Sequence, residues 1–254
     1  LDGKVNFITK IGNDKNGEMA LNLYKSLGMD IASIIQDKNH STGVAGIMVN
    51  EKTGDNAINI IPGAAGTLTN DDIEKNLNFI ANTDIFLTQL ETPYDVTKYA
   101  LKKAKENKLT TILNPAPACQ INDDDFKLID FFTPNETEAE FYLNKKIETS
   151  LDIKNAAEEL LGKGIKNVII TLGEKGIYFA NNKENFFLEA YKLKKPVIDT
   201  TGAGDAFNGA LAVALSNTFE IKDALNFANK VAGISTTKLG AAASMPLAKE
   251  LVNY

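Results

Sequence analysis

The sequence predicts an α/β fold: a doubly wound, mostly parallel sheet with a small β lid. Two observations predict this fold. From residue 70 onward, short apolar strands alternate with amphipathic helices, a spacing typical of parallel strands joined by crossover connections. Between residues 39 and 62, two β-rich segments flank a polar turn with no helix between them, as in a hairpin. The 254 residues suffice for one large domain or a domain with a small appendage.

The first part of the chain is predicted to contain two strands, one helix and the hairpin. We expect strands at 5–11 and 31–35, separated by an amphipathic helix at 17–27. The hairpin pairs 41–49 with 56–61 around Thr53-Gly54-Asp55, and we expect it to stand apart from the sheet as a lid. An edge hairpin of the main sheet is the alternative. The α/β domain then comprises residues 1–38 and 63–254, and the lid comprises residues 39–62.

The remainder of the chain is predicted to alternate between strands and helices. Strands are expected at 84–90, 110–113, 131–132, 168–172, 177–180 and 186–188. Helices are expected at 71–81, 94–107, 136–143, 152–161, 222–237 and 247–252. Lys195-Pro196-Val197-Ile198 is expected to end one more strand, directly before a glycine-rich turn and an apolar helix.

That turn, Gly202-Ala203-Gly204, predicts an anion-binding site at the start of the helix. It leaves backbone N–H groups free of bulky side chains at the positive end of the helix dipole. Asp205 follows directly, and a carboxylate beside an anion site is explained if it removes a proton from an attacking hydroxyl. An ordinary helix cap is the alternative. The spacing fits neither a dinucleotide fingerprint, because Phe207 replaces the third glycine, nor a P-loop, because Ala210 and Leu211 replace Lys and Ser/Thr.

Composition excludes several classes of function. A net charge of −6 argues against binding of nucleic acid, and all 27 basic residues are lysines. Backbone donors and lysines must therefore provide any phosphate contacts. The only cysteine, Cys119, and the only histidine, His40, cannot form a Cys/His metal cluster. No apolar run reaches the roughly 18 residues needed to span a membrane, so we expect no membrane partner and a cytoplasmic location.

Informative side chains follow several predicted strands. Glu91, Asn114-Pro115-Ala116-Pro117-Ala118, Thr133-Pro134-Asn135-Glu136-Thr137-Glu138 and Thr171-Leu172-Gly173-Glu174-Lys175-Gly176 each come directly after a strand. Ligands of open α/β sheets bind beyond the carboxyl ends of the strands. Each segment has an alternative explanation: Glu91 suits a helix N-terminus, and the glycines suit a simple turn. Together they predict a ligand site at one edge of the sheet.

The string D-T-x-G-A-G-D-x-F-x-G-A, from Asp199 onward, resembles the C-terminal signature of the ribokinase-like (PfkB) carbohydrate kinases. S-T-G-V-A at Ser41, Q-L-E at Gln89 and the segments after Asn114 and Thr133 extend the resemblance over nearly the whole chain, closest to its ribokinase branch. This implies ATP-dependent phosphorylation of a sugar, D-ribose giving D-ribose 5-phosphate. Kinases for deoxyribose, fructose or a nucleoside, and a non-catalytic sensor of the same fold, are the alternatives. The failed dinucleotide spacing disfavours a dehydrogenase.

The resemblance also implies roles for individual residues. Asp205 is the catalytic base, Gly202, Ala203 and Gly204 form the anion hole, and Glu91 binds the sugar together with Asp205. The positions that match the ATP site are Asn135, Thr171, Gly173, Gly176, Gly204 and Asn229. Glu138 matches the position near Mg²⁺. The positions that match a K⁺ site are Asp199, Thr201, Ser235, Lys238, Gly240 and Ser244. For Asp199 a turn-capping role is the alternative.

Two family segments that grip the sugar, G-x-N-x-D and G-G-K-G-x-N, are absent. We therefore expect a strand, a flap segment and a helix of roughly 50–60 residues to precede Leu1 in the complete protein. Residues 1–254 alone are expected to be poorly soluble and unable to phosphorylate a sugar. The apolar residues of the hairpin, Val44, Ile47 and Val49 opposite Ile58, Ile60 and Ile61, predict a homodimer formed through the lid.

Overall fold

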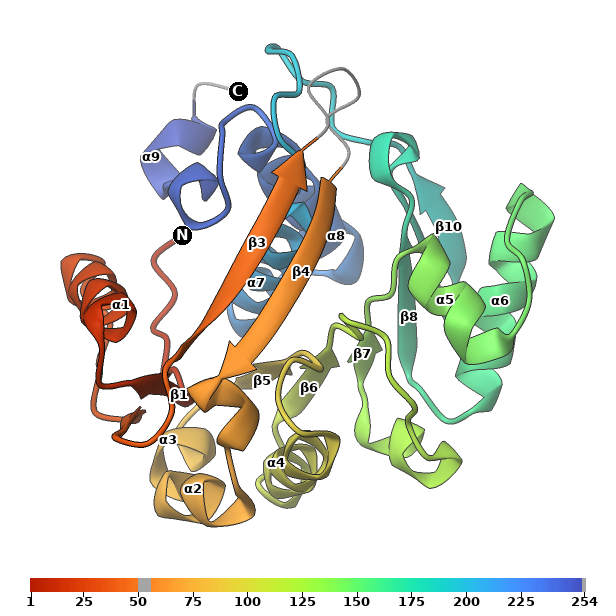
Figure 1. The fold of residues 1–254 in the computed structure, drawn as a ribbon. Coiled ribbons are helices and arrows are strands. Elements are labelled where there is room, and N and C mark those ends of the chain that lie inside the picture. Colours follow the sequence, from red (N-terminus) through yellow and green to blue (C-terminus); the bar gives the residue numbers. More distant parts are fainter. Residues whose placement is uncertain (50–55, 253–254) are drawn as a thin grey trace.

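The computed structural model describes residues 1–49 and 56–252, so the predicted Thr53-Gly54-Asp55 turn lies outside it. Figure 1 shows its central six-stranded sheet, with strands in the order β10-β9-β8-β7-β6-β5. The first four along the chain run parallel: β5 (Ile85–Thr88), β6 (Thr110–Leu113), β7 (Phe131–Phe132) and β8 (Asn167–Thr171). β9 (Ile177–Asn181) is antiparallel to both its neighbours, β8 and β10 (Asn185–Leu188).

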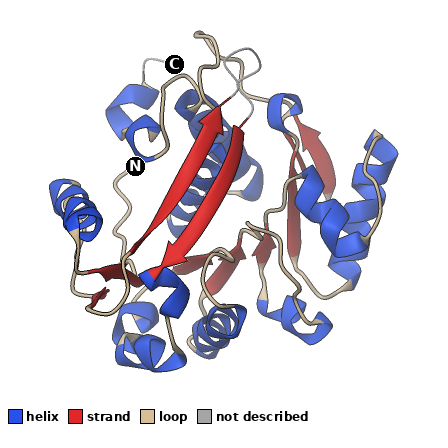
Figure 2. Ribbon diagram, viewed as in Figure 1, coloured by secondary structure: helices blue, strands red, loops and turns tan. Residues whose placement is uncertain are grey.

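Helices cover both faces of this sheet (Figure 2). Successive strand residues point to opposite faces. Leu113, Phe132 and Ile170 pack in one cluster with residues of α5 (Glu136–Leu143) and α6 (Ser150–Gly162). The preceding residues, Ile112, Phe131 and Ile169, pack in a second cluster with residues of α7 (Ala203–Ser216) and α8 (Ile221–Ser235). The predicted doubly wound, mostly parallel α/β fold is therefore confirmed.

A third cluster lies around α2 (Asn70–Lys75), α3 (Leu77–Ala81) and α4 (Tyr94–Glu106). The prediction of one continuous helix over 71–81 is wrong. Asn76 leaves the helical conformation, with φ −111° and ψ 13°, and its side chain donates to the Asp72 carbonyl over 2.8 Å. An asparagine side chain that bonds the local backbone competes with the helix, which explains the break.

The N-terminal part forms a small unit of its own. β1 (Thr9–Gly12) and β2 (Ile34–Asp37) pair in parallel as a two-stranded sheet, separate from the six-stranded sheet. α1 (Lys15–Ser26) connects them and is capped by Asp14, whose side chain accepts the Gly17 N–H over 2.8 Å. Both strands start about three residues later than the apolar pattern predicts, because residues 5–8 make a single bridge, Asn6 to Asp30.

The predicted hairpin consists of β3 (Thr42–Val49) and β4 (Asn56–Gly63), which pair antiparallel. Figure 1 shows it as a two-stranded ribbon of its own, outside the six-stranded sheet. Val44 lies opposite Ile61, and Ile47 lies opposite Ile58. Directly opposed residues share a face and neighbouring pairs alternate, so Val44 and Ile47 are on different faces. Both faces of this ribbon therefore carry exposed apolar side chains.

The strand expected to end at Ile198 does not form. The backbone N–H groups of Ile198 and Asp199 donate to the Thr236 carbonyl, over 2.8 and 3.1 Å, so this segment joins the end of α8 rather than a sheet. The remaining short helices are α9 (Ala248–Leu251) and the 3-10 segments Ala64–Thr67, Asp123–Leu128, Gly173–Lys175 and Ala242–Ser244. Within the described residues, no helix is both long and apolar enough to cross a membrane.

Candidate active site

The glycine-rich turn forms the start of α7. Gly202 is the N-cap in the left-handed conformation, with φ 77°, and the Met245 side chain packs 3.2 Å from where a Cβ would stand. The positive φ favours glycine there, and a Cβ would also require the Met245 side chain to shift slightly. The helix begins at Ala203, so the first N–H groups of α7 have no acceptor within the helix and carry its positive dipole end. A Cβ on Gly204 would meet no atom within 4 Å, so this side of the turn is open.

Asp205 is the third residue of α7, and Gly202 rather than Asp205 occupies the capping position. Asp205 is exposed at the sheet edge, yet nearby protein atoms displace part of the water around its carboxyl group and raise its pKa. The pKa of Glu91 is also raised, first by the same loss of water and then by the negative charge of Asp205. The Glu91 N–H donates to the Gln89 side chain over 3.2 Å. The structure thus brings these two predicted carboxylates together.

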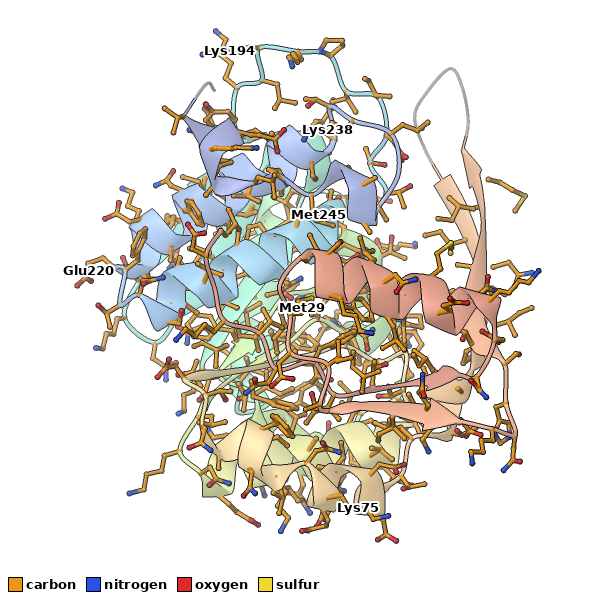
Figure 3. All side chains as sticks on the ribbon, turned by 90° about the vertical axis from the view of Figure 1, so that its left-hand side faces the viewer. Met29, Lys75, Lys194, Glu220, Lys238 and Met245 are labelled. Carbon is orange, nitrogen blue, oxygen red and sulfur yellow. The ribbon has the colours of Figure 1, made fainter. Side chains whose placement is uncertain are left out.

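Asp199 is only 3% exposed and bridges two loops. One carboxylate oxygen accepts the Thr201 N–H over 2.9 Å, and the other accepts the Gly240 N–H over 2.8 Å. Hydrogen bonds from the Thr201 side chain and from these two N–H groups lower the pKa of Asp199. Because the bridge is direct, Asp199 fixes the turn before α7 to the loop after α8. Lys238 and Met245 on that loop are labelled in Figure 3, and the Lys238 ammonium pairs with Glu250 over 2.7 Å.

The N-x-x-E segment forms a capping box at the start of α5. The Asn135 N–H donates to the Glu138 carboxylate, and the Glu138 N–H donates to the Asn135 side chain, each over 2.8 Å. Burial raises the pKa of the half-buried Glu138. Asn135 forms a bridge with Thr171, whose N–H donates to the Pro134 carbonyl over 2.9 Å. Three residues of the predicted nucleotide and metal site therefore lie together at the ends of β7 and β8.

The other predicted nucleotide residues have clear structural roles. Gly176 has φ 95°, and a Cβ there would come within 2.0 Å of the Leu188 carbonyl, so close packing against the end of β10 requires glycine. Gly173 also has a positive φ, 56°, but open space around it. The Asn229 side chain donates to the Glu189 carbonyl over 2.7 Å and so fixes the segment that follows β10.

Two buried polar residues beside this site escaped the sequence prediction. The Thr133 hydroxyl donates to the Asn208 side chain over 2.7 Å, and Asn208 in turn donates to the Gly204 carbonyl over 2.9 Å. The sequence carries one signal of their presence: each is a polar residue within an apolar segment, Phe131-Phe132 before Thr133 and the apolar start of α7 around Asn208. Their contact joins residues 75 positions apart, which no local pattern specifies.

Comparison with known proteins shows what this arrangement resembles. The model of the pfkB family carbohydrate kinases matches residues 1–248. A ribokinase of Staphylococcus aureus is 40% identical over 246 residues, which cover 96% of this chain and 80% of that protein. A deoxyribokinase of Salmonella typhimurium is 31% identical over 255 residues, covering 100% of this chain and 82% of that one. The solved structure of Arabidopsis thaliana ribokinase complexed with ribose and ATP has a TM-score of 0.85 at 27% identity, covering 97% of this chain and 80% of that chain.

The family match includes the turn that carries Asp205, the paired carboxylates and the capping box at the end of β7. It confirms the family that the signature from Asp199 predicts. This chain therefore belongs to the pfkB family of carbohydrate kinases and is a sugar kinase.

Proposed function

We propose that this chain is an ATP-dependent ribokinase that converts D-ribose to D-ribose 5-phosphate, with Asp205 as the general base. The observation that carries the proposal is the position of Asp205 in the first turn of α7, beside N–H groups that have no acceptor within the helix. Its raised pKa moves the carboxylate toward the range in which a base accepts a proton effectively. The named ribokinase relatives, one of them complexed with ribose and ATP, support this choice of substrate.

The chemistry follows from this placement. Asp205 takes the proton of the primary sugar hydroxyl as that oxygen attacks the γ-phosphorus of ATP. A new O–P bond forms, the bond from the γ-phosphorus to ADP breaks, and ADP leaves with the electron pair. The N–H groups of Gly204 and Asp205 are proposed to face the negative charge that spreads over the transferred group. The Ala203 N–H already donates to the Thr200 carbonyl over 3.1 Å, so it would have to leave that acceptor to join them. Since the other two donors belong to a helix turn, they need no reorganisation during the reaction.

Glu91 is proposed to hold the sugar by accepting a hydrogen bond from a hydroxyl group. The charge of Asp205 acts on the Glu91 carboxyl group and raises its pKa, which supports a sugar contact beside the proposed base. The deoxyribokinase relative supports a second candidate substrate, 2-deoxyribose, which differs from ribose by one hydroxyl group. A site that hydrogen-bonds the 2-hydroxyl of ribose would reject 2-deoxyribose, because its polar group would be buried without a partner when 2-deoxyribose binds.

We propose that Asn135, Thr171, Gly173, Gly176, Gly204 and Asn229 line the nucleotide site. Glu138 suits a magnesium site, because Mg²⁺ bound to a nucleotide needs only one or two protein carboxylates besides the phosphates. When bound, Mg²⁺ neutralises charge on the phosphates. For K⁺, the Asp199 oxygens already accept N–H groups but keep further lone pairs. Backbone carbonyls and hydroxyls near Thr201, Ser235, Lys238, Gly240 and Ser244 would complete that site.

The exposed apolar side chains of the β3–β4 ribbon support a homodimer formed through the lid. Met48 is 65% exposed and Ile61 is 60% exposed. An ATP-consuming sugar kinase is also proposed to work in the cytoplasm, where ATP is supplied.

A coupled ADP-release assay on the full-length protein tests the proposed function. The panel contains ribose, 2-deoxyribose, fructose and nucleosides, each with ATP, Mg²⁺ and K⁺. We expect the highest kcat/KM with ribose. A higher kcat/KM with 2-deoxyribose would make 2-deoxyribose the substrate in place of ribose. Binding of a sugar without any ADP release would favour the non-catalytic sensor.

A further inference from the structure

Asn208 is a buried amide in the apolar face of α7. It is 4% exposed, and its neighbours in the helix, Ala206, Phe207, Ala210 and Leu211, are buried apolar residues. A polar group in such surroundings costs free energy unless all its hydrogen bonds are made. Both ends of the Asn208 amide are used: one by Gly204 and the other by Thr133.

The two contacts fix the orientation of this amide. The Gly204 carbonyl can only accept, so the NH₂ group of Asn208 must face it, at 2.9 Å. The amide oxygen then faces Thr133, whose hydroxyl donates to it over 2.7 Å. Asn208 therefore transmits the position of Thr133 to the first turn of α7.

Thr133 is itself held by the central sheet. It is 1% exposed, it directly follows β7, and its N–H donates to the Leu113 carbonyl at the end of β6 over 3.1 Å. Its own carbonyl accepts the Asn114 side chain over 3.0 Å. A continuous chain of hydrogen bonds, Asn114 to Thr133 to Asn208 to Gly204, thus runs from the ends of two central strands to the glycine-rich turn.

The end of this chain is a group whose direction matters for catalysis. The Gly204 carbonyl and the Asp205 N–H belong to one planar peptide unit, in which the two bonds point in opposite directions. Fixing the carbonyl therefore fixes the direction of the Asp205 N–H and the position of the Asp205 Cα. Glycine has the greatest backbone freedom of any residue, so this peptide gains most from a second constraint.

We propose that Asn208 and Thr133 are positioning residues for phosphoryl transfer, which hold the Gly204–Asp205 peptide in its productive orientation. Neither residue touches the reacting atoms. They act through the anion-hole donor and the base that this peptide carries. The inference rests on the proposed kinase function of Asp205, but the hydrogen bonds that carry it are independent of the sugar.

The primary test is Thr133→Val, which removes the hydroxyl with little change of shape, together with Asn208→Leu. We expect kcat to fall about 10- to 100-fold, the scale for misplaced catalytic groups, with KM for ATP and sugar changed less than about twofold. Thr133→Ser keeps the hydroxyl and should restore most of kcat. In the double variant kcat should fall no further than in Asn208→Leu alone, because Thr133 acts through Asn208.

Thr111→Val is the matched control. Thr111 is a fully buried threonine of the neighbouring strand β6, and its hydroxyl donates to the Leu128 carbonyl over 2.6 Å, away from α7. Because the Thr111 hydroxyl also accepts the Asp130 N–H over 3.0 Å, this variant should lower Tm at least as much as Thr133→Val does and leave kcat unchanged. Equal kcat in Thr133→Val and the wild type, or an equal fall of kcat in Thr111→Val, would overturn the proposal.

Amide hydrogen exchange provides a readout that needs no sugar. The N–H of Ala206 donates to the Gly202 carbonyl over 2.9 Å and reports on the first turn of α7. We expect faster exchange there in Thr133→Val and Asn208→Leu but not in Thr111→Val. Unchanged exchange would overturn the positioning role. Faster exchange in a protein that phosphorylates no sugar would instead refute the proposed function and leave the positioning role in place.

Discussion

We call the carboxyl ends of the central strands, together with the turn before α7, the catalytic edge. The catalytic edge buries polar side chains that have hydrogen-bond partners, whereas the β3–β4 ribbon exposes apolar side chains. At the catalytic edge, Asp199, Thr133 and Asn208 are almost fully buried and each has partners. No buried side-chain polar atom lacks a hydrogen bond anywhere in the described residues. On the ribbon, by contrast, apolar side chains such as Met48 and Ile61 face solvent. The chain itself fixes the geometry of one region, whereas the other leaves apolar side chains exposed to solvent.

The base of the ribbon resembles the catalytic edge rather than the rest of the lid. Asp14 accepts the Thr42 N–H over 2.8 Å and the Thr42 hydroxyl over 2.7 Å, while it also caps α1. A Cβ on Gly12 would lie 2.5 Å from the Thr42 nitrogen, so the two segments touch through their backbones. A two-stranded ribbon is marginally stable alone. The lid is therefore firmly fixed at its base, and its exposed faces remain available for contact.

Breaking the catalytic edge should have the largest effect. Asp205→Asn removes the proposed base, so we expect kcat to fall about 10²- to 10⁴-fold with little change in ATP affinity. Asp223→Asn is the matched control, because Asp223 is the third residue of α8 as Asp205 is of α7. Steady-state kinetics on both variants measure this, and near-normal turnover in Asp205→Asn would remove Asp205 from its assigned role.

The same variant has a second, opposite effect on stability. A carboxyl whose pKa is raised on folding binds its proton more tightly in the folded state. Its contribution to the free energy of unfolding is therefore most favourable at low pH and declines as pH rises through the folded pKa. Above that pH, Asp205→Asn should raise Tm slightly, as is common when a catalytic charge is removed. Thermal scans at several pH values measure this.

Charging the ribbon should have the next largest effect, on assembly. Met48 and Ile61 lie on one face of the ribbon, because Met48 pairs with Ala57 and Val44 with Ile61. A buried apolar side chain contributes about 1.5–3 kcal/mol, so Ile61→Lys should weaken the proposed dimer about 10- to 100-fold. Leu151→Lys is the control, since Leu151 on α6 is also 65% exposed but lies outside the ribbon. Analytical sedimentation at several concentrations measures dissociation of the proposed dimer in each variant. A monomeric wild type at micromolar concentration would exclude the dimer.

The sequence predicts those elements whose bounds are set by interactions between residues that are close together in the chain. The bounds of β6, β7 and α5 are predicted correctly, because apolar alternation and the Asn135 cap act within a few residues. The expected strand at 195–198 does not form, because the N–H groups of Ile198 and Asp199 donate to the Thr236 carbonyl rather than to a neighbouring strand.

In the candidate site, too, local motifs are predicted from the sequence, whereas contacts between distant segments are not. The motif from Asp199 identifies Asp205, but its raised pKa depends on atoms from distant segments. The N-x-x-E pattern is both a family motif and a capping box; the resemblance used only the first meaning, although the capping box is an equally local signal. The contact between Thr133 and Asn208 required the folded chain, since it spans the sheet and α7.

Cation activation of the wild type and of Asp199→Ala tests the proposed K⁺ site beside the glycine-rich turn. Potassium is expected to raise the rate at least about fivefold over a large organic cation, the lower end of usual effector coupling. Asp199→Ala removes the bridge to Thr201 and Gly240 and should reduce that response. Rates are compared at matched ionic strength, with Asp125→Ala, another buried carboxylate, as control. Equal rates in both salts for the wild type would exclude the cation site.

The smallest expected effect concerns the repulsion between the two carboxylates. The charge of Asp205 contributes to the raised pKa of Glu91, although the loss of water contributes more. Asp205→Asn should therefore lower the pKa of Glu91 without returning it to its ordinary value. Carboxyl carbon NMR titration measures this directly. Glu138 is the internal control, because burial alone raises its pKa and Asp205 does not contribute.

In the wild type, both raised pKa values act in one direction on activity. As pH falls through them, Glu91 and Asp205 take up protons, so kcat/KM should decline at a higher pH than for ordinary carboxyl groups. An unchanged Glu91 titration in Asp205→Asn would mean that the two carboxylates do not interact. A sugar held by Glu91 through another hydroxyl would then not bring its primary hydroxyl to Asp205, and the proposed acceptor site would have to be placed elsewhere.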